Sequence, residues 1–531
     1  MEKIKIVRSL RKNIFQWIKD NRKEAIILGL VILIGAIFRL YKIDGYMTFL
    51  GDEGRDVIIV RRLLVDFDPI LIGPRTSIGD MYLGPLYYYM MAPALLLSAL
   101  NPVGPAIMIA LLGVVTILFI WYVTRLWFSP EKTGQGRALS VAGLVAAGLY
   151  AISPVVIEYS RSSWNPNIMP FFALLTIFSV WKWWHEEKLR WLFVTSISMA
   201  FVLQSHYLGL LLLPVIGFFW LLTLIKVKSK KKESKEFIKY TVMMAGLLAF
   251  LMSPLVIFDA RHGWRNFSSM GKFFGERQTT VSARPWTALP KAGTIFQTIV
   301  TRLLAGKNVV VGKYAALVLE VGIVAPAISL LKSRLRDRES RAYLLLIVWL
   351  SVAIIGLGVY KQHVYDHYYG FFYAAPFILL GALVQKTHSK FGLDGKIFAT
   401  AVVSFLVIAS LLSHPLRYTP NYQMKRAMDV ANLISNKSDG AKFNLAVIAD
   451  RNYEDGYQYF LEKDGEPVYD IDPLNLEDTI ADQLFAVCEL PKEECDPVHS
   501  PKAEIANFGW SVVENQWDIS GVTVFRLVHS Q

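Results

Sequence analysis

Charged residues are scarce in this sequence of 531 residues. Asp, Glu, Lys and Arg make up 19% of the chain, whereas hydrophobic residues make up 54% and aromatic residues 13%. Soluble proteins have an apolar share of about 45–50%, so this composition excludes a soluble globular chain. A bilayer core about 30 Å thick needs roughly 20 apolar residues per helical crossing, and such runs follow one another up to Ser413. The sequence therefore predicts an all-α polytopic membrane protein in this part.

Other features are missing, and each absence narrows the choice of function. No small-residue cleavage site follows the first apolar run at 26–40, so this run is expected to stay as a membrane anchor. The sequence has no low-complexity linker and no internal repeat of the kind found in inverted-repeat transporters. The apolar runs hold almost no charge at their centres, where a transporter places ionisable residues along its substrate path. A transporter or flippase of lipid-linked glycans is kept as the alternative to an enzyme.

Cysteine is almost absent, because Cys488 and Cys495 are the only two in the chain. Both lie in the polar C-terminal part, where acidic residues outnumber basic ones. If this part lies outside the cytoplasm, a disulfide between them is expected. Two buried free thiols are the alternative.

Basic residues predict the side of the membrane that each segment occupies. Residues 1–23 contain eight Lys and Arg, so the positive-inside rule places this end in the cytoplasm. Basic stretches at 125–137, 226–232 and 332–338 are expected on the same side. Two apolar runs, 84–100 and 105–123, lie between the outer loop after the first helix and the inner loop at 125–137. Because these loops are on opposite sides, only one of the two runs can cross the membrane. The proline- and tyrosine-rich run at 84–100 is therefore predicted to be a juxtamembrane or re-entrant helix on the outer side.

The remaining runs divide the chain into three regions. A cytoplasmic N-terminus at 1–23 precedes a membrane domain at 24–414, and an extracytoplasmic domain occupies 415–531. In the last region, β-rich runs and one helical pattern predict a small α/β domain. We expect the protein in the plasma or inner membrane, with no nucleic-acid partner. Eleven crossings are expected, at 24–41, 103–123, 138–157, 166–184, 190–206, 207–225, 238–257, 313–331, 341–360, 370–386 and 396–414.

The outer face of this topology gathers carboxylates, arginines and histidines from separate loops. The loop at 42–102 contains Asp52, Glu53 and Arg55, and the loop at 258–312 begins with further basic residues. Transfer of a group from a lipid phosphate needs cations for the phosphate that leaves. It also needs a base for the proton of the acceptor, and a carboxylate can be that base. The outer loops therefore predict chemistry on a lipid-linked substrate at the membrane surface.

An ordered set of motifs makes this prediction more specific. Asp52-Glu53-Gly-Arg55 lies in the first outer loop, Pro85-Leu-Tyr-Tyr precedes the next crossing, and Ser160-Arg161 follows Ser153-Pro154. With these motifs the chain resembles the GT-C membrane glycosyltransferases, in the branch of the protein O-mannosyltransferases and aminoarabinose transferases. The resemblance implies a polyprenyl-phosphate sugar donor, an outward-facing site and inversion at the anomeric carbon. It also implies that Asp52 activates the acceptor and that Arg55 helps to hold the site.

The chain departs from the family pattern at two places. Leu83-Gly84 occupies the position of a polar pair that usually precedes Pro-Leu-Tyr-Tyr, so one phosphate contact is missing. Asn165 and Asn167 stand where the second loop commonly has an Asp. A second carboxylate, and a divalent metal held between two, are thereby put in doubt, and no cofactor is expected.

The candidate site residues fall into three groups, each with a simpler alternative. Asp52 could be only the N-cap of the following helix, Arg161 could pair with Glu158, and His206 could be an ordinary interfacial histidine. The partners expected are a polyprenyl-phosphate-linked sugar, a protein, glycolipid or polysaccharide acceptor, and the lipid bilayer. The candidates are Asp52 and Glu53 for catalysis, Arg55, Arg161, Arg261, His262, Lys361 and His363 for the donor phosphate or sugar, and Tyr87, Asn165 and His206 for the acceptor or sugar.

Overall fold

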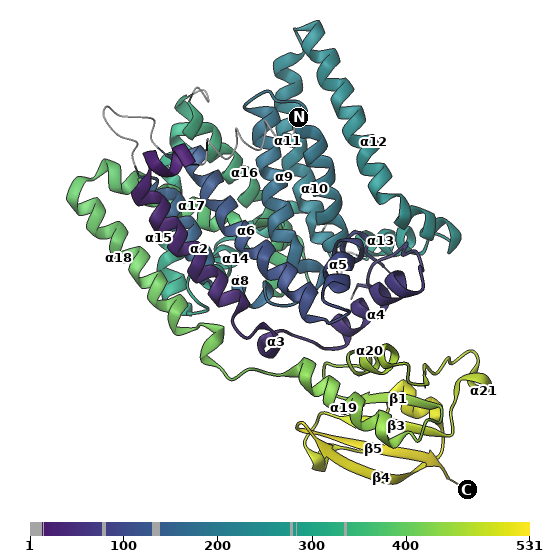
Figure 1. Ribbon diagram of the computed structural model, residues 1–531. Helices are drawn as coiled ribbons and strands as arrows, with labels where there is room; N and C mark the ends of the chain where they lie inside the picture. The colour runs from purple at the N-terminus through teal and green to yellow at the C-terminus, as the bar shows by residue number, and fades with distance from the viewer. Residues whose placement is uncertain are drawn as a thin grey trace.

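The computed structural model describes residues 13, 15–76, 81–129, 139–276, 280–282, 284–333 and 337–530. A helical membrane domain is followed by a small C-terminal domain that contains a sheet, and the two lie against each other (Figure 1). The helices of the first part are α2 (Arg22–Leu40), α3 (Ile43–Tyr46), α4 (Gly51–Val65), α5 (Leu86–Leu97), α6 (Val103–Phe128), α7 (Val141–Ile152), α8 (Pro154–Tyr159), η1 (Asn165–Ile168), α9 (Met169–Trp184), α10 (Trp191–Ser205), η2 (Tyr207–Leu211), α11 (Leu212–Val227), α12 (Lys231–Arg261), α13 (Arg265–Gly275), η3 (Pro285–Lys291), α14 (Ala292–Leu303), α15 (Val309–Ser333), α16 (Arg338–Val359), η4 (Asp366–Phe372), α17 (Ala374–Lys390), α18 (Gly392–Leu412) and η5 (Pro415–Arg417).

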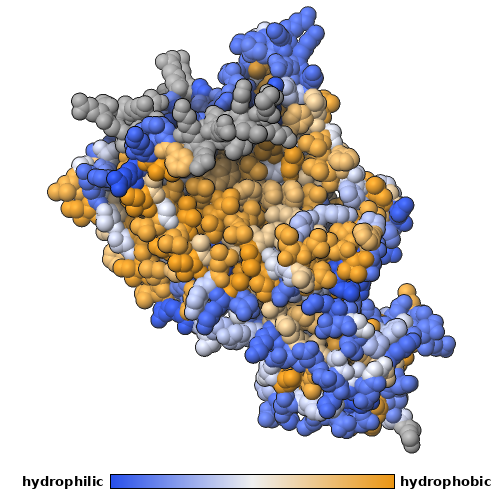
Figure 2. All heavy atoms as spheres, viewed as in Figure 1, coloured by the Kyte–Doolittle hydropathy of each residue, from blue (hydrophilic) through white to orange (hydrophobic). Residues whose placement is uncertain are grey.

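Each of the eleven predicted crossings falls on a helix or on a pair of consecutive helices. Within the described residues, six helices are long and apolar enough to cross a membrane, and the bent pair η4 and α17 raises this number to seven. The other predicted crossings correspond to α2, α9 and α10 and to the pair α7 and α8, whose helices are shorter or carry more charge. Figure 2 shows the result on one face, a hydrophobic band between hydrophilic ends. The chain is a multi-pass membrane protein, and the number of crossings is approximate.

The predicted juxtamembrane run forms α5, a helix of 12 residues. At 1.5 Å per residue such a helix is about 18 Å long, which is too short for the hydrocarbon core. It packs beside α4 near the end of the membrane domain that faces the C-terminal domain (Figure 1).

Polar side chains join helices inside the membrane domain. The Thr176 hydroxyl lies 2.8 Å from that of Ser198, and the hydroxyls of Ser179 and Thr195 are 2.7 Å apart, so α9 and α10 are linked at two levels. Lipid tails are as apolar as the helix surfaces, so there is no hydrophobic driving force for helices to associate in a bilayer. Close packing of small residues and hydrogen bonds between helices hold them together instead. These contacts hold α10 against α9.

The C-terminal domain is the predicted α/β unit. Its sheet has the order β2-β1-β3-β5-β4. Strands β2, β1 and β3 run parallel, β5 runs antiparallel to β3, and β4 runs antiparallel to β5. Side chains alternate along the central strands, so that one face packs on α19 and α20 and the other on Ile505 and Phe508 of α22. Cys488 and Cys495 form a disulfide, which decides between the two alternatives left by the sequence. The elements are α19 (Gln423–Lys437), β1 (Phe443–Ile448), α20 (Asp455–Asp464), β2 (Val468–Tyr469), α21 (Leu476–Thr479), β3 (Gln483–Cys488), η6 (Lys492–Glu494), α22 (Ala503–Phe508), β4 (Ser511–Ile519) and β5 (Val522–His529).

Candidate active site

Asp52 lies in the first turn of α4 and is not the N-cap residue of this helix. Leu50 is the N-cap residue, and its backbone N–H donates to Glu53 Oε2 at 3.0 Å. The acidic residue at N3 therefore satisfies the free N–H at the start of the helix, as in a capping box. The alternative that Asp52 is only the N-cap is wrong, and its side chain is available for a ligand.

Asp52 and Glu53 line a cavity of about 260 Å³ between the membrane domain and the C-terminal domain. The cavity is bounded by the start of α4, by the loop after α8 and by the segment that precedes α20. A volume of this size is close to the lower limit for pockets that hold small ligands. The lining residues are Thr48, Leu50, Gly51, Asp52, Glu53, Glu158, Tyr159, Ser162, Trp164, Asn167, Arg451 and Tyr453.

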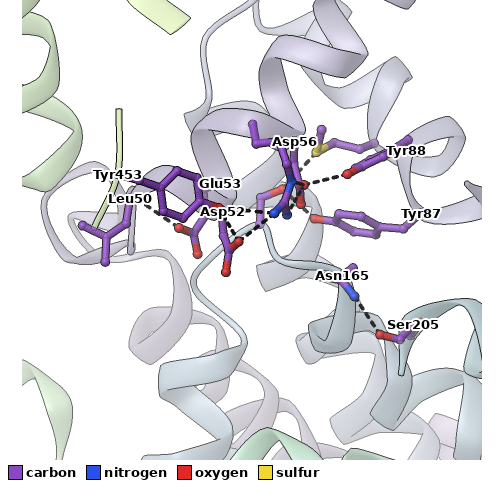
Figure 3. A network of polar contacts seen from close by, with 12 residues as sticks. Leu50, Asp52, Glu53, Asp56, Tyr87, Tyr88, Asn165, Ser205 and Tyr453 are labelled. Atoms are coloured by element: carbon purple, nitrogen blue, oxygen red, sulfur yellow. Dashed lines mark hydrogen bonds and ion pairs between the residues drawn. The ribbon is translucent and has the colours of Figure 1, made fainter. Parts of the chain in front are cut away.

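One oxygen of Asp52 accepts both of the side-chain hydrogen bonds found in the structure. Oδ1 accepts from Arg55 Nη1 at 2.8 Å and from the Tyr453 hydroxyl. Figure 3 shows the other oxygen turned away from these two donors. The Asp52 side chain is 43% exposed, so a ligand in the cavity can reach it.

Arg55 is held between two carboxylates. Its Nε and Nη2 lie 3.1 Å and 2.8 Å from Asp56 Oδ1, and the Tyr88 hydroxyl donates to the same oxygen at 2.8 Å (Figure 3). Burial opposes the charge of Arg55, but the carboxylates of Asp56 and Asp52 outweigh this effect and raise the pKa of the guanidinium. Arg55 therefore stays charged and orients Asp52, in agreement with a supporting role.

Glu53 differs from Asp52 in its surroundings. It is buried, and burial together with the negative charge of Asp52 raises its pKa to about 8, although the hydrogen bond from Leu50 acts in the opposite direction. Near neutral pH the Glu53 carboxyl is therefore mainly protonated. Two adjacent carboxyl groups with different environments are suited to different tasks in one reaction.

Arg161 does not reach the cavity. Its guanidinium is buried and donates to the carbonyl oxygens of Phe38 at 3.3 Å and Tyr41 at 2.8 Å, at the end of α2. These carbonyls lack partners within their helix, so Arg161 satisfies them and joins the two segments. The alternative pair with Glu158 is also wrong, because Glu158 binds Lys307 at 2.9 Å.

The three predicted acceptor contacts are not among the described residues that line the cavity. Asn165 donates to the Ser205 carbonyl at 2.7 Å, and the Tyr87 hydroxyl is 2.6 Å from that of Ser163. His206 Nδ1 accepts from the Leu208 N–H at 3.2 Å. The His206 ring packs against Tyr368 of η4, with 4.5 Å between the ring centroids. All three side chains join neighbouring segments of the membrane domain.

The remaining predicted cations are spread over the surface. Arg261 and His262 are exposed at the end of α12, where the His262 ring stacks on Phe258 with 4.0 Å between centroids. Lys361 and His363 are exposed in the segment between α16 and η4. The structure does not bring these four side chains to the walls of the cavity among its described residues. No group of three or more His, Cys, Asp or Glu in the described part of the chain has an arrangement that could hold a metal ion.

Comparisons with known proteins bear on the family resemblance and on the fold. Residues 83–258 match the family model described as "Dolichyl-phosphate-mannose-protein mannosyltransferase". The predicted resemblance to GT-C glycosyltransferases is confirmed. The crystal structure of ArnT from Cupriavidus metallidurans bound to undecaprenyl phosphate superposes with a TM-score of 0.57 and 11% identity, over 94% of this chain and 97% of that chain. Its apo state gives 0.56 and 12% over the same shares. No curated protein sequence matches the chain.

On this GT-C fold, the residues that sequence reasoning missed come from the C-terminal domain. Arg451 and Tyr453 lie more than 390 positions from Asp52 along the chain and yet line the same cavity. Arg451 is the one Lys or Arg among the described residues that line it. A signal was present in the two glycines that flank Asp52-Glu53, because Gly51 and Gly54 are one helical turn apart and leave that side of α4 open to close packing.

The departure from the GT-C pattern at Gly84 has a steric reason. A Cβ atom on Gly84 would lie 2.1 Å from Gln204 Oε1, and the same oxygen accepts from the Leu86 N–H at 3.2 Å. Gln204 therefore caps the start of α5 through a space that a larger residue at 84 would fill. The missing polar side chain is replaced by a link between α5 and α10.

Proposed function

We propose that this protein is an inverting glycosyltransferase that moves a sugar from a polyprenyl-phosphate donor to an acceptor at the outer face of the membrane. The observation that carries the proposal is the oriented carboxylate of Asp52 in a cavity at the end of the membrane domain. The match to the mannosyltransferase family model and the fold shared with ArnT support it. The ArnT title names undecaprenyl phosphate as the bound lipid, and we transfer this lipid class to the present chain.

The proposed reaction is a single displacement. Asp52 accepts the proton from an acceptor hydroxyl, and the acceptor oxygen forms a bond to the anomeric carbon. The bond from that carbon to the phosphate oxygen breaks at the same time, and its electron pair leaves with the polyprenyl phosphate. One displacement inverts the configuration at the carbon. Glu53, neutral near pH 7, would donate a hydrogen bond to a ligand and would not compete as a base.

Arg451 is the proposed contact for the donor phosphate. Arg451 is among the residues that line the cavity, and a guanidinium can donate charge-assisted hydrogen bonds to phosphate oxygens. Arg55 is less suited to this task because Asp52 and Asp56 already occupy its donors. This assignment moves the phosphate role from the predicted loop cations to the C-terminal domain.

The orientation in the membrane follows from the charge pattern. The start of α4, which lines the cavity, and the C-terminal domain lie at one end of the membrane domain, and the basic turn between α11 and α12 lies at the other (Figure 1). The positive-inside rule then favours a cytoplasmic basic turn and an external cavity. The disulfide of the C-terminal domain agrees with an oxidising compartment.

A transfer assay with purified protein in lipid nanodiscs tests the proposal. Radiolabelled polyprenyl-phosphate mannose and related donors are supplied with candidate acceptors, and Asp52→Asn is compared with wild type. Loss of the base is expected to lower kcat by roughly 10²–10⁴-fold. Asp44→Asn, a change at an exposed acid of the neighbouring α3, is the matched control and is expected to be active. Undiminished transfer by Asp52→Asn would refute the proposed role, and movement of the lipid across liposomes without transfer would favour a flippase.

A further inference from the structure

We infer that Tyr453 of the C-terminal domain is a positioning residue for Asp52, so that the active site is complete only when the two domains are docked. The inference rests on the proposed function, because it assigns Asp52 as the base. It adds a role for the C-terminal domain, which sequence reasoning left without one.

The Tyr453 hydroxyl lies at the centre of the contacts around Asp52. It donates to Asp52 Oδ1 and accepts from Arg55 Nη1 at 3.2 Å, while the same Nη1 donates to Oδ1 at 2.8 Å. Carboxylate, guanidinium and phenol thus form a closed ring of three hydrogen bonds. Hydrogen bonds to a charged carboxylate are stronger than those between neutral groups, so this ring restrains rotation of the Asp52 side chain.

The restraint has a direction that suits a base. Both donors engage Oδ1, and Figure 3 shows Oδ2 pointing away from them. A carboxylate fixed in this way presents one oxygen to a proton from the cavity and keeps the other in its contacts with the protein. Correct placement of reacting groups is worth a large factor in rate, and a displacement of about 1 Å can cost about 10²-fold.

The backbone around Tyr453 is fixed on the membrane domain by its neighbours. Asn452 Oδ1 accepts from the Gly51 N–H at 2.8 Å, and its Nδ2 donates to Glu489 Oε1 at 2.6 Å. A Cβ atom on Gly51 would lie 2.5 Å from the Tyr453 ring, so the ring lies flush against the first turn of α4. The glycine that precedes Asp52 is therefore explained by the position of this ring.

Contacts away from the cavity hold the domain in the same place. Arg62 of α4 forms an ion pair with Glu462 of α20 at 2.8 Å. Gln423 Oε1 accepts from the Phe49 N–H at 3.0 Å, and Tyr459 donates to the Leu100 carbonyl. The interface extends along α4, and Tyr453 is its contact with the proposed base.

Tyr453→Phe separates this role from simple domain docking, because it keeps the ring that packs on Gly51 and removes only the hydroxyl. Tyr459→Phe is the matched control, since it also removes one interdomain hydrogen bond but does not touch Asp52. In the transfer assay, Tyr453→Phe is expected to lower kcat roughly 10–100-fold and to leave the donor KM unchanged. Tyr459→Phe is expected to keep the wild-type kcat and KM.

A second measurement does not depend on turnover. A water-soluble carbodiimide labels carboxyl groups, and mass spectrometry follows the rate at which Asp52 is labelled at one fixed pH in the full-length protein in nanodiscs. Tyr453→Phe is expected to raise this rate, because Asp52 Oδ1 loses the hydroxyl that contacts it, and Tyr459→Phe is not. Equal labelling rates for wild type and Tyr453→Phe, or equal effects of the two variants, would overturn the inference. If wild type transfers no sugar but Tyr453→Phe is labelled faster, the positioning contact stands and the proposed function fails.

Discussion

Gly54→Ala is expected to lift the C-terminal domain away from the active site. In an open helix position alanine is favoured over glycine by about 1 kcal/mol, so the substitution would normally stabilise α4. At position 54, however, a Cβ atom would lie 2.3 Å from both the Asp455 carbonyl carbon and the Gly456 nitrogen. These are backbone atoms at the start of α20 and cannot rotate away.

The size of the effect follows from this distance. Carbon atoms pack favourably at about 3.5–4.0 Å, so α20 has to move outward by about 1 Å or more. Overpacking of this kind typically costs about 1–3 kcal/mol, which outweighs the gain in helix propensity. The 3.2 Å contact between Arg55 and Tyr453 would lengthen beyond hydrogen-bonding range, and the ring of contacts at Asp52 would open.

Limited proteolysis of the connection between α18 and α19 measures this loss of docking, with the transfer assay in parallel. Gly54→Ala is expected to be cleaved faster than wild type and to transfer more slowly. The control is Gly246→Ala in α12, where a Cβ atom meets nothing within 4 Å. If Gly54→Ala resists the protease and transfers sugar as well as wild type does, the close approach of α20 to α4 is not needed, and the reasoning is refuted.

Two further substitutions test the charges in the cavity. The folded-state pKa of Glu53 is about 8 against an ordinary 4.5, so stability is highest below about pH 4.5 and falls as pH rises toward 8, by up to about 5 kcal/mol. Glu53→Gln keeps an acceptor for Leu50 and is expected to flatten this decline in thermal unfolding between pH 5 and pH 8; an unchanged slope would contradict the assignment. Arg451→Ala is expected to raise the donor KM roughly 10–100-fold, the cost of one charge-assisted hydrogen bond, and the exposed Lys463→Ala is not. An unchanged KM would move the phosphate to another part of the protein.

Sequence reasoning succeeded where the signal was local or repeated along the chain. Long apolar runs predicted helices because every backbone group in lipid has to find its partner within the segment. Apolar β-rich runs predicted the small C-terminal α/β domain, and the ordered motifs from Asp52 to Arg161 predicted the GT-C resemblance. Each of these inferences used residues that are neighbours or recur at a fixed spacing.

It was less successful for the roles of single cations and polar side chains. Arg161, Asn165 and Tyr87 stand in outer segments that looked catalytic, and each one makes a buried contact that joins segments of the membrane domain. An arginine can donate hydrogen bonds either to a free carbonyl at a helix end or to a phosphate. The sequence around the arginine does not show which of these two acceptors it binds. The distance of Arg261 and Lys361 from the cavity could not be predicted for a similar reason. Topology predicts the side of the membrane on which a residue lies, but not its distance from the cavity.

The sequence by itself determined the class of protein, the position of Asp52 after the first crossing, and the acidic pair with Arg55 one turn later. These properties depend on hydrophobic length and on helical periodicity, which are local. Only the tertiary structure decided that Tyr453 and Arg451 complete the cavity and that Gly51 and Gly54 make room for them. Such contacts join residues about 400 positions apart, and they exist because two domains pack with a particular geometry that no local pattern specifies.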